Sequence, residues 1–108
     1  MPYTAQATTP EPARADVDQL AGITVVEFGT DWCPHCIGAQ FAIATALGAR
    51  SDIAHIKVED GAGKPLGRSY RVKLWPTLIV LKDGQEVARL VRPTKAELIS
   101  QALKPISG

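Results

Sequence analysis

Two cysteines three positions apart stand where a predicted strand gives way to a predicted helix. The segment Ile23–Phe28 is rich in β-branched residues and almost continuously apolar, which is typical of a strand buried on both faces. After a short loop, apolar residues recur at intervals of three and four over residues 33–48, which predicts a helix. We therefore expect Cys33 and Cys36 at a strand-to-helix junction, within the first helical turn.

The rest of the chain alternates between strand and helix patterns. Asp83-Gly84 separates two apolar runs and predicts a tight hairpin turn. Thr94 is the predicted N-cap of the last helix. The other predicted elements are a helix with Pro10 and Pro12 in its first turn that ends at Gly22, a strand over 53–58, a short helix over 66–70, strands over 77–81 and 86–91, and a helix over 94–103 with Leu98, Ile99 and Ala102 on one face. This order predicts an α/β fold with a mixed sheet of four to five strands.

Length and charge narrow the classes of protein further. The 108 residues suit one domain over residues 1–108, with 1–12 as a short edge strand or a flexible tail. A net charge of +1 predicts neither a nucleic acid nor an anionic membrane as partner. Met1–Pro12 has no basic opening and no apolar run, so we expect a cytoplasmic protein, and we expect a monomer. Two cysteines are too few for a four-thiolate site, so we expect no metal and no cofactor.

The Trp32-Cys33-Pro34-His35-Cys36 segment carries the chemistry. The N-terminus of a helix has unpaired N–H groups and a partial positive charge, which favour a thiolate at Cys33. A protonated His35 would act in the same direction. Cys36, one turn further along, can attack a mixed disulfide formed at Cys33 and release the partner. The segment therefore predicts a thiol–disulfide exchange site.

The chain resembles the thioredoxin family from about Ile23 to Leu103. The resemblance rests on the VVEF strand, the WCxxC segment, Trp75-Pro76-Thr77 about forty residues later, and the Lys82-Asp83-Gly84 turn. It implies a three-layer α/β/α sandwich and an oxidoreductase that acts on protein disulfides. The Pro34-His35 insert is similar to that of the DsbA-type oxidases.

The resemblance also implies roles for residues around the cysteines. Pro76 should follow a cis peptide bond and lie against the cysteine pair, next to backbone that pairs with a bound substrate. Trp32, Pro34, Trp75 and Arg92 should contribute to substrate binding. In this chain Trp75 replaces an aliphatic residue, Arg92-Pro93 a loop glycine, Phe41 a kinking proline and Ile37 a lysine, which implies altered partner choice.

Glu27 stands where the family has a buried aspartate. We expect it to act as a base that helps to deprotonate Cys36; the alternative is a strand-end carboxylate paired with Lys57 at the surface. His55 either pairs with Glu27 or is a satisfied histidine of the core or rim.

The leading hypothesis is a protein disulfide reductase or isomerase in the cytosol, with a more oxidising potential than an ordinary thioredoxin. Its electron donor would be a reductase of the thioredoxin-reductase type or glutathione. The alternatives are a thioredoxin-fold binding module, a glutaredoxin-like enzyme that uses glutathione, and a zinc or iron–sulfur site shared between two protomers.

Overall fold

A four-stranded mixed sheet lies at the centre of the computed structural model, which describes residues 3–107. Its strands are β1 (Ile23–Gly29), β2 (Ile53–Glu59), β3 (Thr77–Lys82) and β4 (Gln85–Val91), in the order β2-β1-β3-β4. β1 is parallel to β2, and β3 is antiparallel to both β1 and β4. The predicted combination of a parallel pair with an antiparallel hairpin is confirmed.

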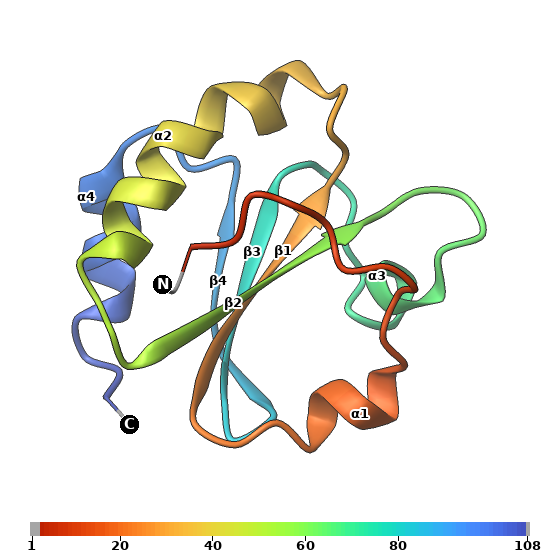
Figure 1. Ribbon diagram of the computed structural model, residues 1–108, viewed down its shortest axis with the longest axis horizontal. Helices are drawn as coiled ribbons and strands as arrows, with labels where there is room; N and C mark the ends of the chain where they lie inside the picture. The colour runs from red at the N-terminus through yellow and green to blue at the C-terminus, as the bar shows by residue number, and fades with distance from the viewer. Residues whose placement is uncertain (1–2, 108) are drawn as a thin grey trace.

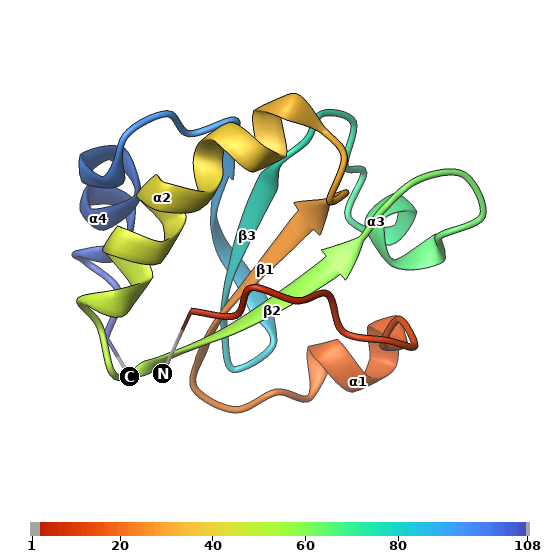
Figure 2. The same ribbon diagram turned by 45° about the horizontal axis from the view of Figure 1, so that its top comes forward.

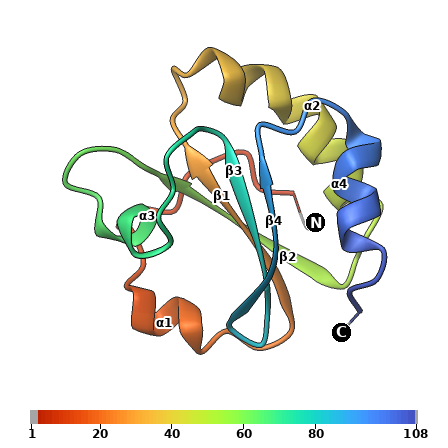
Figure 3. The ribbon, with the colours of Figure 1, turned by 180° about the vertical axis from the view of Figure 1, so that it is seen from behind.

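Helices cover both faces of the sheet and make three layers. α2 (Pro34–Gly48) and α4 (Ala96–Leu103) pack on one face, whereas α1 (Arg14–Asp18) and α3 (Pro65–Ser69) lie toward the other (Figures 1 and 2). Seen from behind, α2 and α4 lie side by side at one edge of the molecule, far from α1 and α3 (Figure 3). None of the helices in the described part of the chain is long and apolar enough to span a membrane.

Strand β1 occupies the interior of the sheet, and all seven of its residues are buried. Ile23 and Val25 join the apolar core beneath α2 and α4, while Val26 and Phe28 join the core on the opposite face. Because side chains alternate along a strand, Glu27 points to the same face as Val25. A carboxylate is thereby buried under α2, the helix that carries the cysteines.

The N-terminal segment runs along β2 without becoming a fifth strand (Figure 1). Two of its hydrogen bonds reach the backbone of β2. The Thr8 N–H donates to the Lys57 carbonyl oxygen at 2.7 Å, and the Thr4 hydroxyl donates to the His55 carbonyl oxygen at 3.0 Å. Isolated contacts of this kind make no continuous ladder. The sheet therefore has four strands, and Met1, Pro2 and Gly108 lie outside the described residues.

Two sequence-based predictions about the helices are wrong. α1 begins at Arg14, because each proline restrains the residue before it to extended backbone and the helix starts only after Ala13, its N-cap. The N-cap of α4 is Lys95 and not Thr94, and no side chain caps it. Leu98 is 45% exposed, whereas Ile99 and Leu103 are buried, because the face of α4 toward α2 follows their four-residue spacing.

The predicted hairpin turn is confirmed. Asp83 and Gly84 have φ values of 50° and 83°, the left-handed values that a two-residue hairpin turn requires. The turn also holds the loop before β1, because the Gly22 N–H donates to the Asp83 carboxylate at 2.8 Å and the Asp83 N–H to the Gly22 carbonyl at 2.8 Å. A Cβ on Gly84 would collide with the backbone carbonyl of Asp18.

Candidate active site

The two thiols meet at the first turn of α2, as predicted. Cys33 is the N-cap residue, with extended backbone, and Pro34 opens the helix, a position where a missing N–H costs nothing. The backbone N–H of Cys36 donates to Cys33 Sγ at 3.3 Å. Both cysteines are free and buried, Cys33 being 5% exposed.

The environment shifts the pKa values of the two thiols in opposite directions. Burial disfavours a charged sulfur at Cys33, but hydrogen bonds from the Cys36 thiol and from the backbone N–H groups of Cys36 and His35, together with the charge of Arg92, lower its pKa. Burial, followed by the hydrogen bond to Cys33, raises the pKa of Cys36 to about 12. Cys33 is thus the thiol that ionises first, and Cys36 holds its proton.

The Trp75–Pro76 peptide bond is cis, as the family resemblance implies. Arg92 secures this loop from β4: its backbone N–H donates to the Pro76 carbonyl at 2.8 Å, and its Nε donates to the Trp75 carbonyl at 2.9 Å. Arg92 itself has a φ of 52°, in the left-handed region that few side chains adopt. Arg92 therefore joins the loop before β3 to the end of β4.

The indole of Trp75 is held in a fixed orientation. Its Nε1–H donates to the buried Asp60 carboxylate at 2.9 Å, and Arg68 Nη2 binds the same oxygen at 2.7 Å. Trp32, which is 66% exposed, stands edge-on to Trp75 with 5.9 Å between ring centroids. The two tryptophans thus form one aromatic unit, in which Trp75 is anchored and Trp32 faces solvent.

A shallow hollow of about 340 Å³ lies beside the helix start, lined by Pro34, His35, Gly38, Ala39, Arg92, Pro93 and Thr94. His35 is exposed there, and the group of His35 that lowers the pKa of Cys33 is its backbone N–H. The role predicted for the imidazole stays a prediction. Pro34 and Arg92, both expected to bind substrate, are brought together along this hollow.

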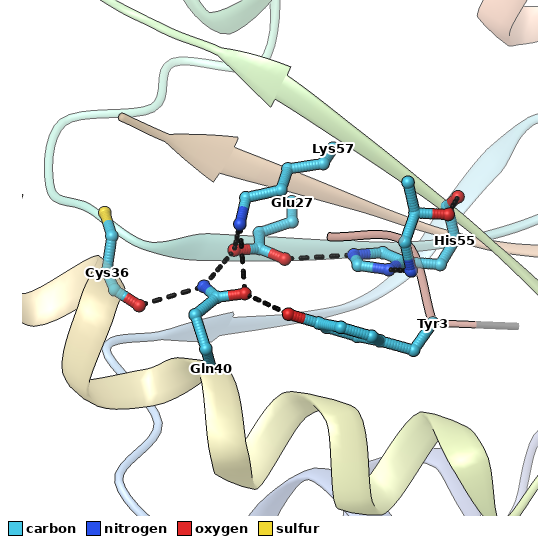
Figure 4. Close-up of polar contacts among 7 residues, drawn as sticks. Tyr3, Glu27, Cys36, Gln40, His55 and Lys57 are labelled. Atoms are coloured by element: carbon cyan, nitrogen blue, oxygen red, sulfur yellow. Dashed lines mark hydrogen bonds and ion pairs between the residues drawn. The ribbon is translucent and has the colours of Figure 1, made fainter. Parts of the chain in front are cut away.

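Glu27 lies at the centre of a buried polar network (Figure 4). His55 Nε2 is 2.9 Å from Glu27 Oε1, and Gln40 Nε2 donates to Glu27 Oε2 at 2.8 Å. Lys57 Nζ lies 3.8 Å from Oε2. The expected pairing with His55 therefore occurs, and that with Lys57 occurs inside the protein and not at its surface. The hydrogen bonds of Glu27 reach Cys36 only through Gln40, so its role as a base stays a prediction.

Several residues of this site carry no signal in the sequence. Gln40, Tyr3, Asp60 and Gly29 are ordinary polar or small residues, and only the fold brings them to the cysteines or to the residues beside them. Gly29 follows the buried run, and a Cβ at this position would come within 2.6 Å of Cys36 Sγ. Over residues 3–107, no group of three or more His, Cys, Asp or Glu side chains is placed to hold a metal ion.

A family model described as Thioredoxin matches residues 5–105. The solved structure of thioredoxin 2 from Pseudomonas aeruginosa PAO1 in its reduced form is 48% identical, with a TM-score of 0.85, and the match covers 95% of each chain.

Curated relatives match over a shorter length. Thioredoxin H2-1 of Oryza sativa subsp. japonica is 30% identical over 76 residues, 70% of this chain and 55% of that protein. The thioredoxin of Rhodospirillum rubrum is 36% identical over 76 residues, 68% of this chain and 71% of that protein. The chain thus matches little more than half the length of the rice protein.

Proposed function

This chain belongs to the thioredoxin family, and from that premise we propose that it is a thiol–disulfide oxidoreductase acting on protein disulfides. One observation carries the proposal. A buried thiol whose pKa is lowered, Cys33, lies beside a second thiol that keeps its proton, Cys36. A nucleophile paired with a resolving group is what disulfide exchange needs.

In the proposed reaction, the Cys33 thiolate attacks one sulfur of a substrate disulfide. The substrate S–S bond breaks, its other sulfur leaves as a thiolate that takes up a proton, and a mixed disulfide with Cys33 forms. Cys36 then loses its proton and attacks Cys33 Sγ, which releases the first substrate sulfur as a second thiol. The substrate has gained two electrons and two protons, and the protein holds a Cys33–Cys36 disulfide.

We further propose that the protein works as a reductase or isomerase at a potential above that of an ordinary thioredoxin. The Pro34-His35 insert supports this, because it is similar to the insert of the DsbA-type oxidases. The reduction potential of DsbA is about −120 mV, which is more oxidising than the value of about −270 mV for thioredoxin. Equilibration of the dithiol with glutathione buffers gives the potential directly. A value near that of thioredoxin would contradict this part of the proposal.

The proposed electron donor is a reductase of the thioredoxin-reductase type or glutathione, and the proposed place of work is the reducing cytoplasm, where the protein would act as a monomer. Recovery of the dithiol with each donor distinguishes the two sources of electrons. Cell fractionation and light scattering test the location and the oligomeric state.

Insulin reduction by dithiothreitol tests the central proposal. The wild-type protein should accelerate the reaction, and Cys33→Ser should not. Cys36→Ser should accumulate mixed disulfides, whose protein components identify substrates. Equal rates with and without Cys33 would favour a binding module, and acceleration by glutathione alone would favour a glutaredoxin-like enzyme.

A further inference from the structure

We propose that Gln40 is a positioning residue for the second half of the exchange, in which it holds Glu27 to the helical turn that carries Cys36. Gln40 lies on α2, one turn after Cys36, and its side chain points toward the sheet (Figure 4). The inference rests on the proposed exchange reaction. It concerns only the resolving step, because Gln40 has no contact with Cys33 among its hydrogen bonds.

The side-chain amide of Gln40 makes four hydrogen bonds. Its Nε2 donates to Glu27 Oε2 at 2.8 Å and to the Cys36 carbonyl at 2.9 Å. Its Oε1 accepts from the Tyr3 hydroxyl at 2.6 Å and from Lys57 Nζ at 3.0 Å. An amide has two N–H donors and two oxygen lone pairs, so every hydrogen-bonding position of Gln40 is used.

The chemistry of the neighbours fixes the orientation of this amide. Lys57 can only donate, so it must face Oε1, and the Cys36 carbonyl can only accept, so it must face Nε2. A flipped amide would place its N–H groups against the Lys57 ammonium and its oxygen against the Cys36 carbonyl, so neither contact could be a hydrogen bond. Gln40 therefore presents an N–H to Glu27 in one defined geometry.

The other oxygen of Glu27 is held from β2. The Thr4 backbone N–H donates to His55 Nδ1 at 2.7 Å, so Nδ1 bears no proton and the ring proton lies on Nε2. That Nε2–H then donates to Glu27 Oε1 at 2.9 Å. With Lys57 also near Oε2, the carboxylate is oriented by donors from α2 and β2.

This orientation matters in the step that forms the protein disulfide. The proton of Cys36 must leave as its sulfur attacks Cys33 Sγ and the S–S bond to the substrate breaks; we assign Glu27 as the acceptor. The substrate thiolate then takes up a proton. Through Gln40 Nε2, the carboxylate is tied to the helical turn that carries Cys36. The titratable groups facing Glu27 are His55 and Lys57 from β2, Tyr3 from the N-terminal segment and Cys36 from α2.

The two half-reactions can be separated with 5,5′-dithiobis(2-nitrobenzoate). Attack by Cys33 releases one coloured thiolate, and resolution by Cys36 releases the second. Gln40→Met keeps the length of the side chain and removes all four hydrogen bonds. We expect the first phase to stay within about twofold of the wild-type rate and the second to slow roughly tenfold. Gln101→Met, the same change at an exposed position of α4, should alter neither phase.

A double-substitution cycle distinguishes positioning from general loss of packing. If Gln40 acts through Glu27, then Gln40→Met should slow the second phase by less than about twofold in a Glu27→Gln background. Gln40→Asn, which keeps a neutral amide but is one methylene shorter and should not reach Glu27, should also slow the second phase selectively and covers the case in which Gln40→Met does not fold.

The inference would be overturned if the second phase ran at the wild-type rate in either folded Gln40 variant. It would also be overturned if the second phase of the double variant were slowed by the product of the two single effects, because the two residues would then act independently. A wild-type protein that releases no second thiolate would instead refute the exchange reaction itself. The two failures are thus distinguishable in one assay.

Discussion

The sulfur of Cys36 lies directly against the backbone of Gly29. A Cβ at Gly29 would come within 2.6 Å of Cys36 Sγ, closer than two such atoms can approach. Gly29 is the last residue of β1, and Cys36 is in the first turn of α2. The thiol of Cys36 is thus packed against the last residue of β1.

Gly29→Ala should displace Cys36 and slow the resolving step, while Cys33 keeps its reactivity. Overpacking of this kind costs about 1–3 kcal/mol of unfolding free energy. Urea denaturation of the reduced protein measures the stability, and the two-phase aryl disulfide reaction measures the resolving rate.

Gly48→Ala is the matched control, because Gly48 is exposed at the far end of α2 from the cysteines and a Cβ there would meet no neighbouring part of the chain within 4 Å. This change should stabilise the helix by about 0.5–1 kcal/mol and leave both phases intact. Equal losses from the two alanines would show that the contact with Cys36 is not the cause.

The pKa of Cys33 should rise when a neighbour that lowers it is removed, and the rise should be larger for Cys36 than for Arg92. The hydrogen bond from the Cys36 thiol lowers the pKa of Cys33 more than the charge of Arg92 does. A lowered pKa means that thiolate is present at a lower pH, so the alkylation rate of Cys33 should reach half its maximum below the ordinary value of about 8.5. Cys36→Ala should move that midpoint to higher pH, and Arg92→Gln should move it in the same direction by less.

Arg92→Lys is the control for charge, because it keeps a cation at the same position and loses the planar donor to Trp75. A midpoint that Lys preserves and Gln raises would attribute the effect to charge. Equal upward shifts in both variants would instead attribute it to the loop that Arg92 holds.

Replacing the two tryptophans by phenylalanine should have different consequences. Trp75→Phe removes the indole N–H from Asp60, whose other oxygen is buried without a partner, and should cost about 1.5–3 kcal/mol, the range for a hydrogen bond to a charged group. Trp32→Phe removes an indole that is 66% exposed and should leave stability within about 0.5 kcal/mol. Urea denaturation of both variants makes the comparison, and equal losses would contradict a specific role of Asp60.

The order of the elements and the position of the cysteine pair could be predicted from the sequence because both depend on local signals. β-branched runs, helical spacing and Asp83-Gly84 are readable without the fold, and Cys33 and Cys36 are three residues apart. The cis bond at Pro76 followed from the family resemblance alone. Confinement of the chain to a single domain and the catalytic roles of individual residues stay predictions.

The sequence indicated His55 and Lys57 as partners of Glu27, but the rest of the network could not be predicted, because its members come from separate parts of the chain. Tyr3 and Gln40 are 37 residues apart, and Thr4 and His55 are 51 apart. Their meeting depends on the N-terminal segment running along β2, whereas the pattern of residues 1–12 fits a flexible tail as well as an edge strand. The starts of α1 and α4 differ from the prediction partly because no side chain caps the first turn of either helix, so the usual sequence signal of a helix start is missing there.

The hairpin turn offers a test of the fold that is independent of the thiols. Gly22 and Gly84 both have left-handed backbone, with φ values of 76° and 83°, so an alanine at either position should lose about 1–2 kcal/mol through backbone strain. A Cβ at Gly22 has no atom within 4 Å, whereas one at Gly84 would collide with the Asp18 carbonyl. Gly84→Ala should therefore lose a further 1–3 kcal/mol or so, because α1 must move away from the turn. Urea denaturation of the two variants measures the difference, and equal stability would mean that α1 does not pack on the turn as described.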